Sequence, residues 1–159
     1  MKTRLHRPYE RKGHNSFGDF VCLKCRNFVS AEALFSGVHH RNHCPYCLSS
    51  RHLDLFEAGD RLSACKAVMQ PVALTIKRTN KKYCGANRGE IMLVHQCDEC
   101  GKISINRIAA DDSTEMLWTV FEASFNLETI ENPLTTQTGI TLLAADDRRQ
   151  LHDQLFGRL

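Results

Sequence analysis

Two apolar-rich runs in the middle of the chain form its clearest structural pattern. Residues 71–77 (PVALTIK) and 89–96 (GEIMLVHQ) are rich in apolar and β-branched side chains, and a polar connection separates them. Because that connection carries Gly85 and Asn87, the pattern predicts a β-hairpin. Residues 102–108 (KISINRI) begin with apolar and polar residues in alternation, which predicts a third strand.

Helical spacing replaces this pattern after residue 110. Apolar side chains between residues 116 and 125 recur on one helical face, and Asp112 and Glu115 stand at capping-box spacing before them. The sequence therefore predicts a helix capped by Asp112, and a last helix over residues 142–156. Upstream, residues 52–57 predict a short strand that is followed by a turn at residues 58–60.

The chain contains eight cysteines, and none of its apolar runs is long enough to cross a bilayer. Its basic first residues are not followed by an apolar stretch, so we expect no secretory signal, no membrane partner and a cytoplasmic location. Disulfides are rare in that reducing compartment. Metal ligation is therefore the leading explanation for the cysteines.

Two C-x2-C pairs, Cys22/Cys25 and Cys44/Cys47, are separated by 18 residues. This spacing is typical of a four-cysteine zinc site, because each pair forms a tight turn that aims both sulfurs at one ion. The connecting segment is long enough to bring the second pair back to the first. We therefore expect a first Zn²⁺ ion at these four cysteines.

A third pair, Cys97 and Cys100, follows the second strand of the predicted hairpin and indicates a second Zn²⁺ ion. Cys65 lies at the open base of that hairpin and is the expected third ligand. Cys84 lies in the connecting loop, roughly 23 Å away along the strands. That distance disfavours Cys84 as a ligand unless the loop folds back.

The fourth ligand of this second site is open between three residues. His95 is preferred, since it stands two residues before Cys97 on a strand and projects to the same face. His52 is the second candidate, because it follows the first zinc site closely in the sequence. Cys84 is the third.

Charge is distributed unevenly along the chain, although the net charge is only +3. Residues 1–52 carry nine Lys and Arg against three Asp and Glu, whereas residues 111–159 carry three against nine. The segment 77–88 carries five cations and one aromatic residue, which are Lys77, Arg78, Lys81, Lys82, Tyr83 and Arg88. These residues can contact phosphate and stack on a base, although a solvated polar loop has the same composition.

The string Arg41-Asn42-His43-Cys44-Pro45 stands at the second cysteine pair, and with it the chain resembles the RNHCP domain family. The likeness covers about residues 17–112 and continues through Cys65, His95, Cys97, Cys100 and residues 106–112. Lys66 stands where the family commonly has Gly, and residues 113–159 lie outside the matched part. The resemblance implies a zinc-binding module and leaves its activity open.

Two enzymatic interpretations are weaker. Residues 44–47 (CPYC) are similar to a glutaredoxin-type redox motif, but no strand precedes them and the zinc spacing uses the same sulfurs. The letters around Asn42 and His43 suggest an HNH nuclease, with Asp111 and Asp112 on a hydrolytic metal. However, Asn42 and His43 are adjacent, and Asp112 is better explained as a helix cap. We therefore expect no enzymatic activity.

The sequence predicts an α+β protein made of two small β-rich, zinc-ribbon-like modules and C-terminal α-helices. Its expected segments are a flexible basic arm (1–16), a first zinc module (17–64), a second one with the hairpin (65–112) and an acidic helical extension (113–159). We expect a non-enzymatic protein with two Zn²⁺ ions that binds RNA, associated with the ribosome or translation. The alternative is a transcription-related adaptor whose acidic helices contact a protein partner.

Overall fold

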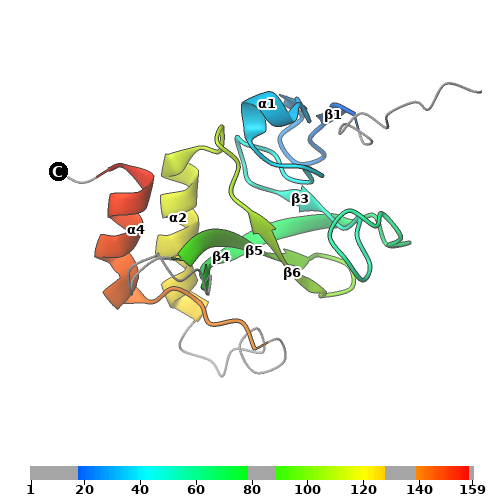
Figure 1. Ribbon diagram of the computed structural model, residues 1–159. Coiled ribbons are helices and arrows are strands. Elements are labelled where there is room, and N and C mark those ends of the chain that lie inside the picture. Colours follow the sequence, from blue (N-terminus) through cyan, green and yellow to red (C-terminus); the bar gives the residue numbers. More distant parts are fainter. Residues whose placement is uncertain (1–17, 79–88, 128–138, 158–159) are drawn as a thin grey trace, which may run out of the picture.

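The computed structural model describes residues 18–78, 89–127 and 139–157. Its main feature is a four-stranded antiparallel sheet, in which the strands follow the order β3-β4-β5-β6. The strands are β3 (Ser50–Arg51), β4 (Val68–Arg78), β5 (Gly89–Cys97) and β6 (Ile103–Arg107). The predicted hairpin and the third strand are confirmed. Figure 1 shows the sheet in the middle, with two helices to its left and the cysteine-rich N-terminal part above it.

The register of the hairpin explains which face of the sheet is apolar. Leu74 lies opposite Leu93, and Ile76 lies opposite Ile91. Because side chains alternate along a strand, these four residues share one face. The register shifts near Pro71, where a β-bulge is expected because proline has no N–H to donate.

Two helices cover this apolar face. Helices α2 (Thr114–Ser124) and α4 (Arg148–Leu155) lie side by side in Figure 1, and short 3-10 turns flank them at Phe125–Leu127 (η1) and Ala145–Asp147 (η2). Leu117, Phe121 and Leu151 are buried with the leucines of the sheet in one core. The fold class is therefore α+β, as predicted, and the helices are part of its main core.

The last helix begins later than the sequence pattern predicts. Leu142 forms a β-bridge with Thr75, and the Leu143 N–H donates to the Leu74 carbonyl at 2.9 Å. These apolar residues extend the edge of β4, so the helix α4 begins only at Arg148.

Asp112 is not the N-cap of α2, contrary to the prediction. The cap is Ser113, whose hydroxyl accepts a hydrogen bond from the Met116 N–H at 3.2 Å. The Asp112 carboxylate points elsewhere, to partners that are far away in the sequence and are described below.

Residues 52–57 form turns, so the predicted strand there is wrong. Strand β3 ends at Arg51, one residue before the predicted start. The Asp60 carboxylate accepts hydrogen bonds from the backbone N–H groups of Leu62, Glu57, Leu55 and Phe56. These bonds hold the pKa of Asp60 below its usual range, and they satisfy amides that a strand would need for its ladder.

The N-terminal part is a small unit with few apolar residues. Strands β1 (Phe20–Val21) and β2 (Phe28–Val29) form a short hairpin, and one turn of helix follows as α1 (Ala33–Ser36). The buried cluster of this unit consists of Cys22, Val29 and Cys44. Such a core is too thin to fold alone, which is typical of metal-stabilised modules. The division of the chain into four segments stays a prediction.

No helix within the described ranges has the length and apolar character that crossing a membrane requires.

Candidate metal centres

Three short turns, each opened by a cysteine, share one backbone pattern; we call residues 22–27, 44–49 and 97–102 knuckles 1, 2 and 3. In each, the carbonyl of the first cysteine accepts from the N–H four residues later, at 2.9–3.0 Å. Its N–H donates to the carbonyl five residues later, at 2.9–3.0 Å. The repeated closure makes both cysteine side chains of a knuckle face the same side.

The residue after the second cysteine of each knuckle has a left-handed backbone. Its φ is 63° at Arg26, 58° at Leu48 and 70° at Gly101. Lys66, which follows Cys65, has the same conformation with φ 55°. This conformation is easiest for glycine, which explains why glycine commonly stands in the family at the place of Lys66.

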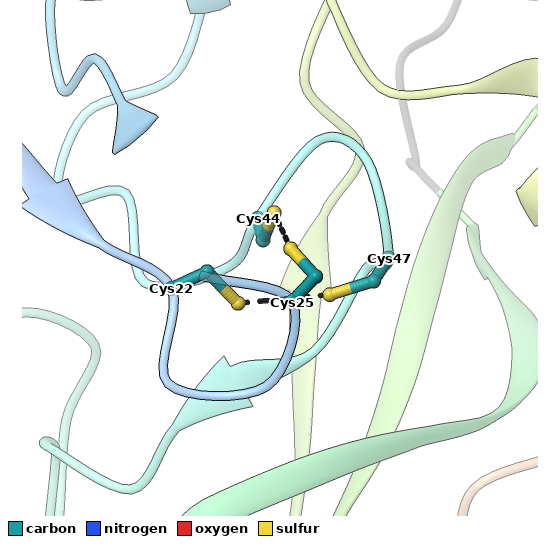
Figure 2. Close-up of side chains that lie close together, drawn as sticks. All are labelled: Cys22, Cys25, Cys44 and Cys47. Atoms are coloured by element: carbon teal, nitrogen blue, oxygen red, sulfur yellow. Dashed lines mark hydrogen bonds between the residues drawn. The ribbon is translucent and has the colours of Figure 1, made fainter. Parts of the chain in front are cut away.

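Knuckles 1 and 2 bring their four sulfurs together, as the spacing predicts. Cys25 and Cys44 have their sulfurs 3.5 Å apart, and those of Cys22 and Cys47 are 3.6 Å apart. Four sulfurs around one tetrahedral Zn²⁺ are separated by about 3.8 Å, given Zn–S bonds of about 2.3 Å. Figure 2 shows the two turns facing each other with these side chains between them. The group can hold one zinc ion.

The thiols of this first group ionise unequally. Burial raises the pKa of Cys44. Burial acts on Cys25 in the same direction, but hydrogen bonds from the Asn27 backbone N–H and the neighbouring thiols lower the pKa of Cys25 to about 6. Since zinc binds thiolates, the lowered pKa of Cys25 favours its binding as a ligand.

The second group consists of His52, Cys65, Cys97 and Cys100, whose ligand atoms all lie within 4.8 Å of one another. The sulfurs of Cys65 and Cys97 are 3.6 Å apart, and the Cys100 sulfur lies 3.4 Å from His52 Nδ1. Three sulfurs and one imidazole nitrogen are a common tetrahedral zinc set. This group can hold a second zinc ion.

Strand pairing places His52 beside Cys65. Strand β3 pairs with the first residues of β4, and the His52 N–H then donates to the Ala67 carbonyl at 2.9 Å. Knuckle 3 follows β5, which is paired with β4, so Cys97 arrives at the same end of the sheet. Burial is the largest influence on the His52 ring and lowers its pKa. The neutral imidazole that a metal needs is thereby favoured.

The preference for His95 as the fourth ligand is wrong. His95 faces the same side as Cys97, but it lies two residues deeper in the core. Its Nε2 is 2.7 Å from the Leu48 carbonyl, and the Asn106 amide lies 2.9 Å from its Nδ1. Both ring nitrogens are therefore used, and burial lowers the pKa of His95 to about 3. The neutral ring ties the sheet to knuckle 2.

Arg41 and His43 form a buried charge cluster with the segment before α2. Arg41 contacts Asp111 at 2.8 Å and Asp112 at 3.3 Å, and His43 Nε2 lies 2.8 Å from Asp112. The Asp112 carboxylate also accepts from the Ala109 N–H at 2.8 Å. The side chains of Arg41 and Asp112 have no exposed surface. These contacts fasten knuckle 2 to the start of α2.

Asn42 fastens a different segment. Its side-chain amide donates to Asp54 at 3.0 Å and accepts from Arg61. Asp54 in turn accepts from the Gly59 and Arg61 N–H groups, so Asn42 holds the turn-rich residues 54–61. The three polar residues before Cys44 thus connect knuckle 2 to the start of α2 and to the turns of residues 54–61.

A comparison with protein-family models matches residues 17–118 to the RNHCP domain. The chain belongs to the RNHCP domain family. Curated proteins and solved structures give no match to it. Strands β1–β6, both cysteine groups and the first part of α2 lie within the matched RNHCP domain, so the buried Arg41 and His43 contacts are internal to that domain.

The structure describes only some of the other predicted site residues of this RNHCP-domain protein. Lys77 is exposed near the end of β4, and Arg78 is the last residue of that strand. Cys84 and four of the predicted RNA-contacting residues, Lys81, Lys82, Tyr83 and Arg88, lie outside the described residues. The two metal groups use all seven described cysteines, each of which is a free thiol.

His52 belongs to the second metal group, although the sequence pattern favoured His95 as its fourth ligand. The feature that could have indicated His52 is its position five residues after Cys47, directly after the two residues that pair with residues 68–69. Without knowledge of that two-residue pairing, the closeness of His52 to Cys65 could not be derived.

Proposed function

We propose that this RNHCP-domain protein is a non-enzymatic zinc protein that binds RNA, in association with the ribosome or translation. The observation that carries the proposal is the segment 77–88, which contains five cations and no carboxylate. Arg78 pairs with Gly89, whereas Met69 pairs with Cys97 at the other end of the same hairpin. The residues that flank the basic segment therefore lie at the opposite end of the hairpin from the second zinc group. Cations at such a position can contact a phosphate backbone without disturbing the zinc ligands.

Knuckle 1 supports the proposal with a second basic surface. Lys24 and Arg26 are exposed there, and Phe28 is 62% exposed on the adjacent strand. Cations beside an exposed ring are the combination that binds phosphates and stacks on unpaired bases.

Two observations favour a role without catalysis. His43 and Asp112, the residues that a nuclease would use, are buried and satisfied by each other and by Arg41. The Cys44/Cys47 pair faces Cys22 and Cys25 at zinc-ligand distances, so the dithiol that redox chemistry needs is part of a metal group.

RNA binding is tested by fluorescence anisotropy with a labelled single-stranded RNA and the full-length, zinc-loaded chain at several salt concentrations. Each phosphate contact contributes about −0.7 to the slope of log affinity against log salt. Replacing Lys77, Arg78, Lys81 and Lys82 with Ala should therefore flatten the slope by up to about three units.

The matched control exchanges Lys for Arg and Arg for Lys at the same four positions. Because it keeps every charge, it should keep the salt slope. Sedimentation with ribosomes from a lysate then checks the cellular target. A wild-type chain that binds no RNA at low salt, and does not sediment with ribosomes, contradicts the proposal.

A second candidate function is a protein-interaction adaptor in transcription. The observation that favours it is α1, where Leu34 is 85% exposed and Phe35 is 68% exposed. Adjacent exposed apolar side chains of this size are typical of protein interfaces. The acidic helices are less suited to the role, because the apolar faces of α2 and α4 are buried in the core. If a Leu34→Ser, Phe35→Ser variant loses cellular function while RNA affinity is unchanged, the adaptor hypothesis is favoured.

A further inference from the structure

A cavity of about 150 Å³ lies between knuckle 1 and strand β3. Of the residues in the two metal groups, Cys22 alone contributes to its lining. Phe20, Leu53 and Val68 contribute apolar surface to it. Asn42 and Ser50 contribute an amide and a hydroxyl. A drug-sized ligand needs about 300 Å³ or more, so this cavity has room for one small ring system.

The charged residues that line the cavity are all cations: Lys24, Arg41, Arg51 and Arg61. Two of them are neutralised from outside the cavity, since Arg41 pairs with Asp111 and Asp112, and Arg61 faces Asp54 at 3.8 Å.

The other two cations, Lys24 and Arg51, hydrogen-bond to neutral groups. Lys24 donates to the neutral Gln70 side chain at 2.5 Å, and Arg51 Nε donates to the Lys66 carbonyl at 3.1 Å. Neither has a carboxylate partner in the part of the chain that the structure describes. Two positive charges that no described carboxylate pairs therefore stand at a small, partly apolar cavity. They fit a ligand that joins an anion to a ring.

The amide of Asn42 is held in one orientation. Asp54 accepts from its nitrogen and Arg61 donates to its oxygen, which fixes the edge of the amide that lines the cavity. A fixed amide next to an aromatic side chain is the arrangement that proteins use to read and stack a nucleobase.

We propose that this cavity binds one nucleotide unit, with the base against Phe20 and Leu53 and the phosphate at Lys24 and Arg51. The unit can belong to a free nucleotide or to an RNA strand, and only the RNA source rests on the function proposed above. Neither Lys77 nor Arg78, where the basic segment begins, lines the cavity, so different substitutions test the two proposals.

The test uses the full-length, zinc-loaded chain and two-dimensional NMR of its backbone amides. It is titrated separately with each of the four ribonucleoside monophosphates, with inorganic phosphate and with a short single-stranded RNA. At least one monophosphate should shift the amides of Lys24, Asn42 and Arg51 and bind more tightly than phosphate does. The RNA should shift the same amides.

Variants decide whether these cations make the contact. Lys24→Gln together with Arg51→Gln should weaken monophosphate binding by about tenfold or more, because charge-assisted hydrogen bonds to phosphate are lost. Arg149→Gln is the control, since Arg149 is exposed on α4 and lies outside the cavity lining. Zinc content and thermal midpoint are compared with wild type to confirm that the variants fold.

The possible outcomes separate this inference from the proposed function. If RNA binds and neither RNA nor any monophosphate shifts the cavity amides, the inference is overturned and RNA binding stands. If a monophosphate shifts them and RNA binds elsewhere, both proposals stand and the cavity takes free nucleotides only. If a monophosphate shifts them and RNA binds nowhere, the cavity is a free-nucleotide site and the proposed function fails. If phosphate alone binds as tightly as every monophosphate, or nothing binds, the nucleotide site is refuted.

Discussion

At the scale of single residues, the two histidines that the sequence offers as zinc ligands have different roles. His52 directs Nδ1 to the Cys100 sulfur, 3.4 Å away, whereas His95 uses both nitrogens in hydrogen bonds inside the core. The difference comes from position along the sheet, because the metal group gathers where β5 ends. His95 therefore contributes to packing, and His52 to the metal group.

His52→Ala should leave one zinc ion per chain, because it removes one of the four ligands of the second group. His95→Gln should keep two zinc ions but lower the free energy of unfolding by about 1–3 kcal/mol, since a buried hydrogen-bond partner is disturbed. Native mass spectrometry gives the zinc count and chemical denaturation the stability. Loss of a zinc ion from His95→Gln, with two retained in His52→Ala, would reverse the assignment.

Asp112→Asn should lower the free energy of unfolding by about 3–5 kcal/mol, because it removes the fully buried carboxylate that faces both Arg41 and His43 and leaves Arg41 only the partly exposed Asp111. Asp111→Asn is the matched control. It removes the other carboxylate of the same arginine, but Asp111 has 39% of its side chain exposed. The cost there should be about 1 kcal/mol or less. Equal costs in urea denaturation would show that burial does not distinguish the two carboxylates.

At the scale of elements, the three knuckles show how a local sequence produces a binding geometry. Each closes with the same pair of backbone hydrogen bonds and continues through a left-handed residue. Only knuckle 3 has glycine at this position. Arg26 and Leu48 therefore carry a backbone cost that the metal and the neighbouring packing offset.

Gly101→Ala should destabilise the protein by about 1–2 kcal/mol, because alanine is strained at φ 70°. A Cβ at this position would meet no neighbouring atom, so the cost is that of the backbone alone. Lys66→Gly should act in the opposite direction and raise the thermal midpoint. If both variants lower the midpoint equally, the left-handed strain is not the controlling factor.

The elements that could be predicted from the sequence are those with a local signal. The Cys22/Cys25 and Cys44/Cys47 pairs and the strands of the hairpin have fixed spacing or runs of apolar residues. The ligand His52 and the role of Asp112 depend on contacts over 48 and 69–71 residues, which no local pattern contains. The helix cap is Ser113 and not Asp112, because the Asp112 carboxylate is bonded to Arg41 and His43.

At the scale of the whole molecule, two hydrogen bonds connect the first metal group to the main core. The Leu48 carbonyl in knuckle 2 contacts His95, and the Ser113 N–H at the start of α2 donates to the Pro45 carbonyl at 2.9 Å. Cys44→Ser should therefore lose one zinc ion and also lower the thermal midpoint of the whole chain. A variant that keeps both zinc ions and its midpoint would show that the first group is not a structural metal site.

Cys84 is expected to be dispensable for metal binding, because both groups have four ligands without it. Cys84→Ser should retain two zinc ions by native mass spectrometry, whereas Cys97→Ser should lose one. A one-zinc Cys84→Ser protein would instead assign Cys84 to the second group.

The zinc content of the wild-type chain tests the account most directly, because the fold, the knuckles and both proposals depend on two metal-closed groups. Native mass spectrometry of the full-length chain, purified without added chelator, should show two zinc ions per chain. A saturated protein with one zinc ion, or a folded protein that binds none, would contradict it.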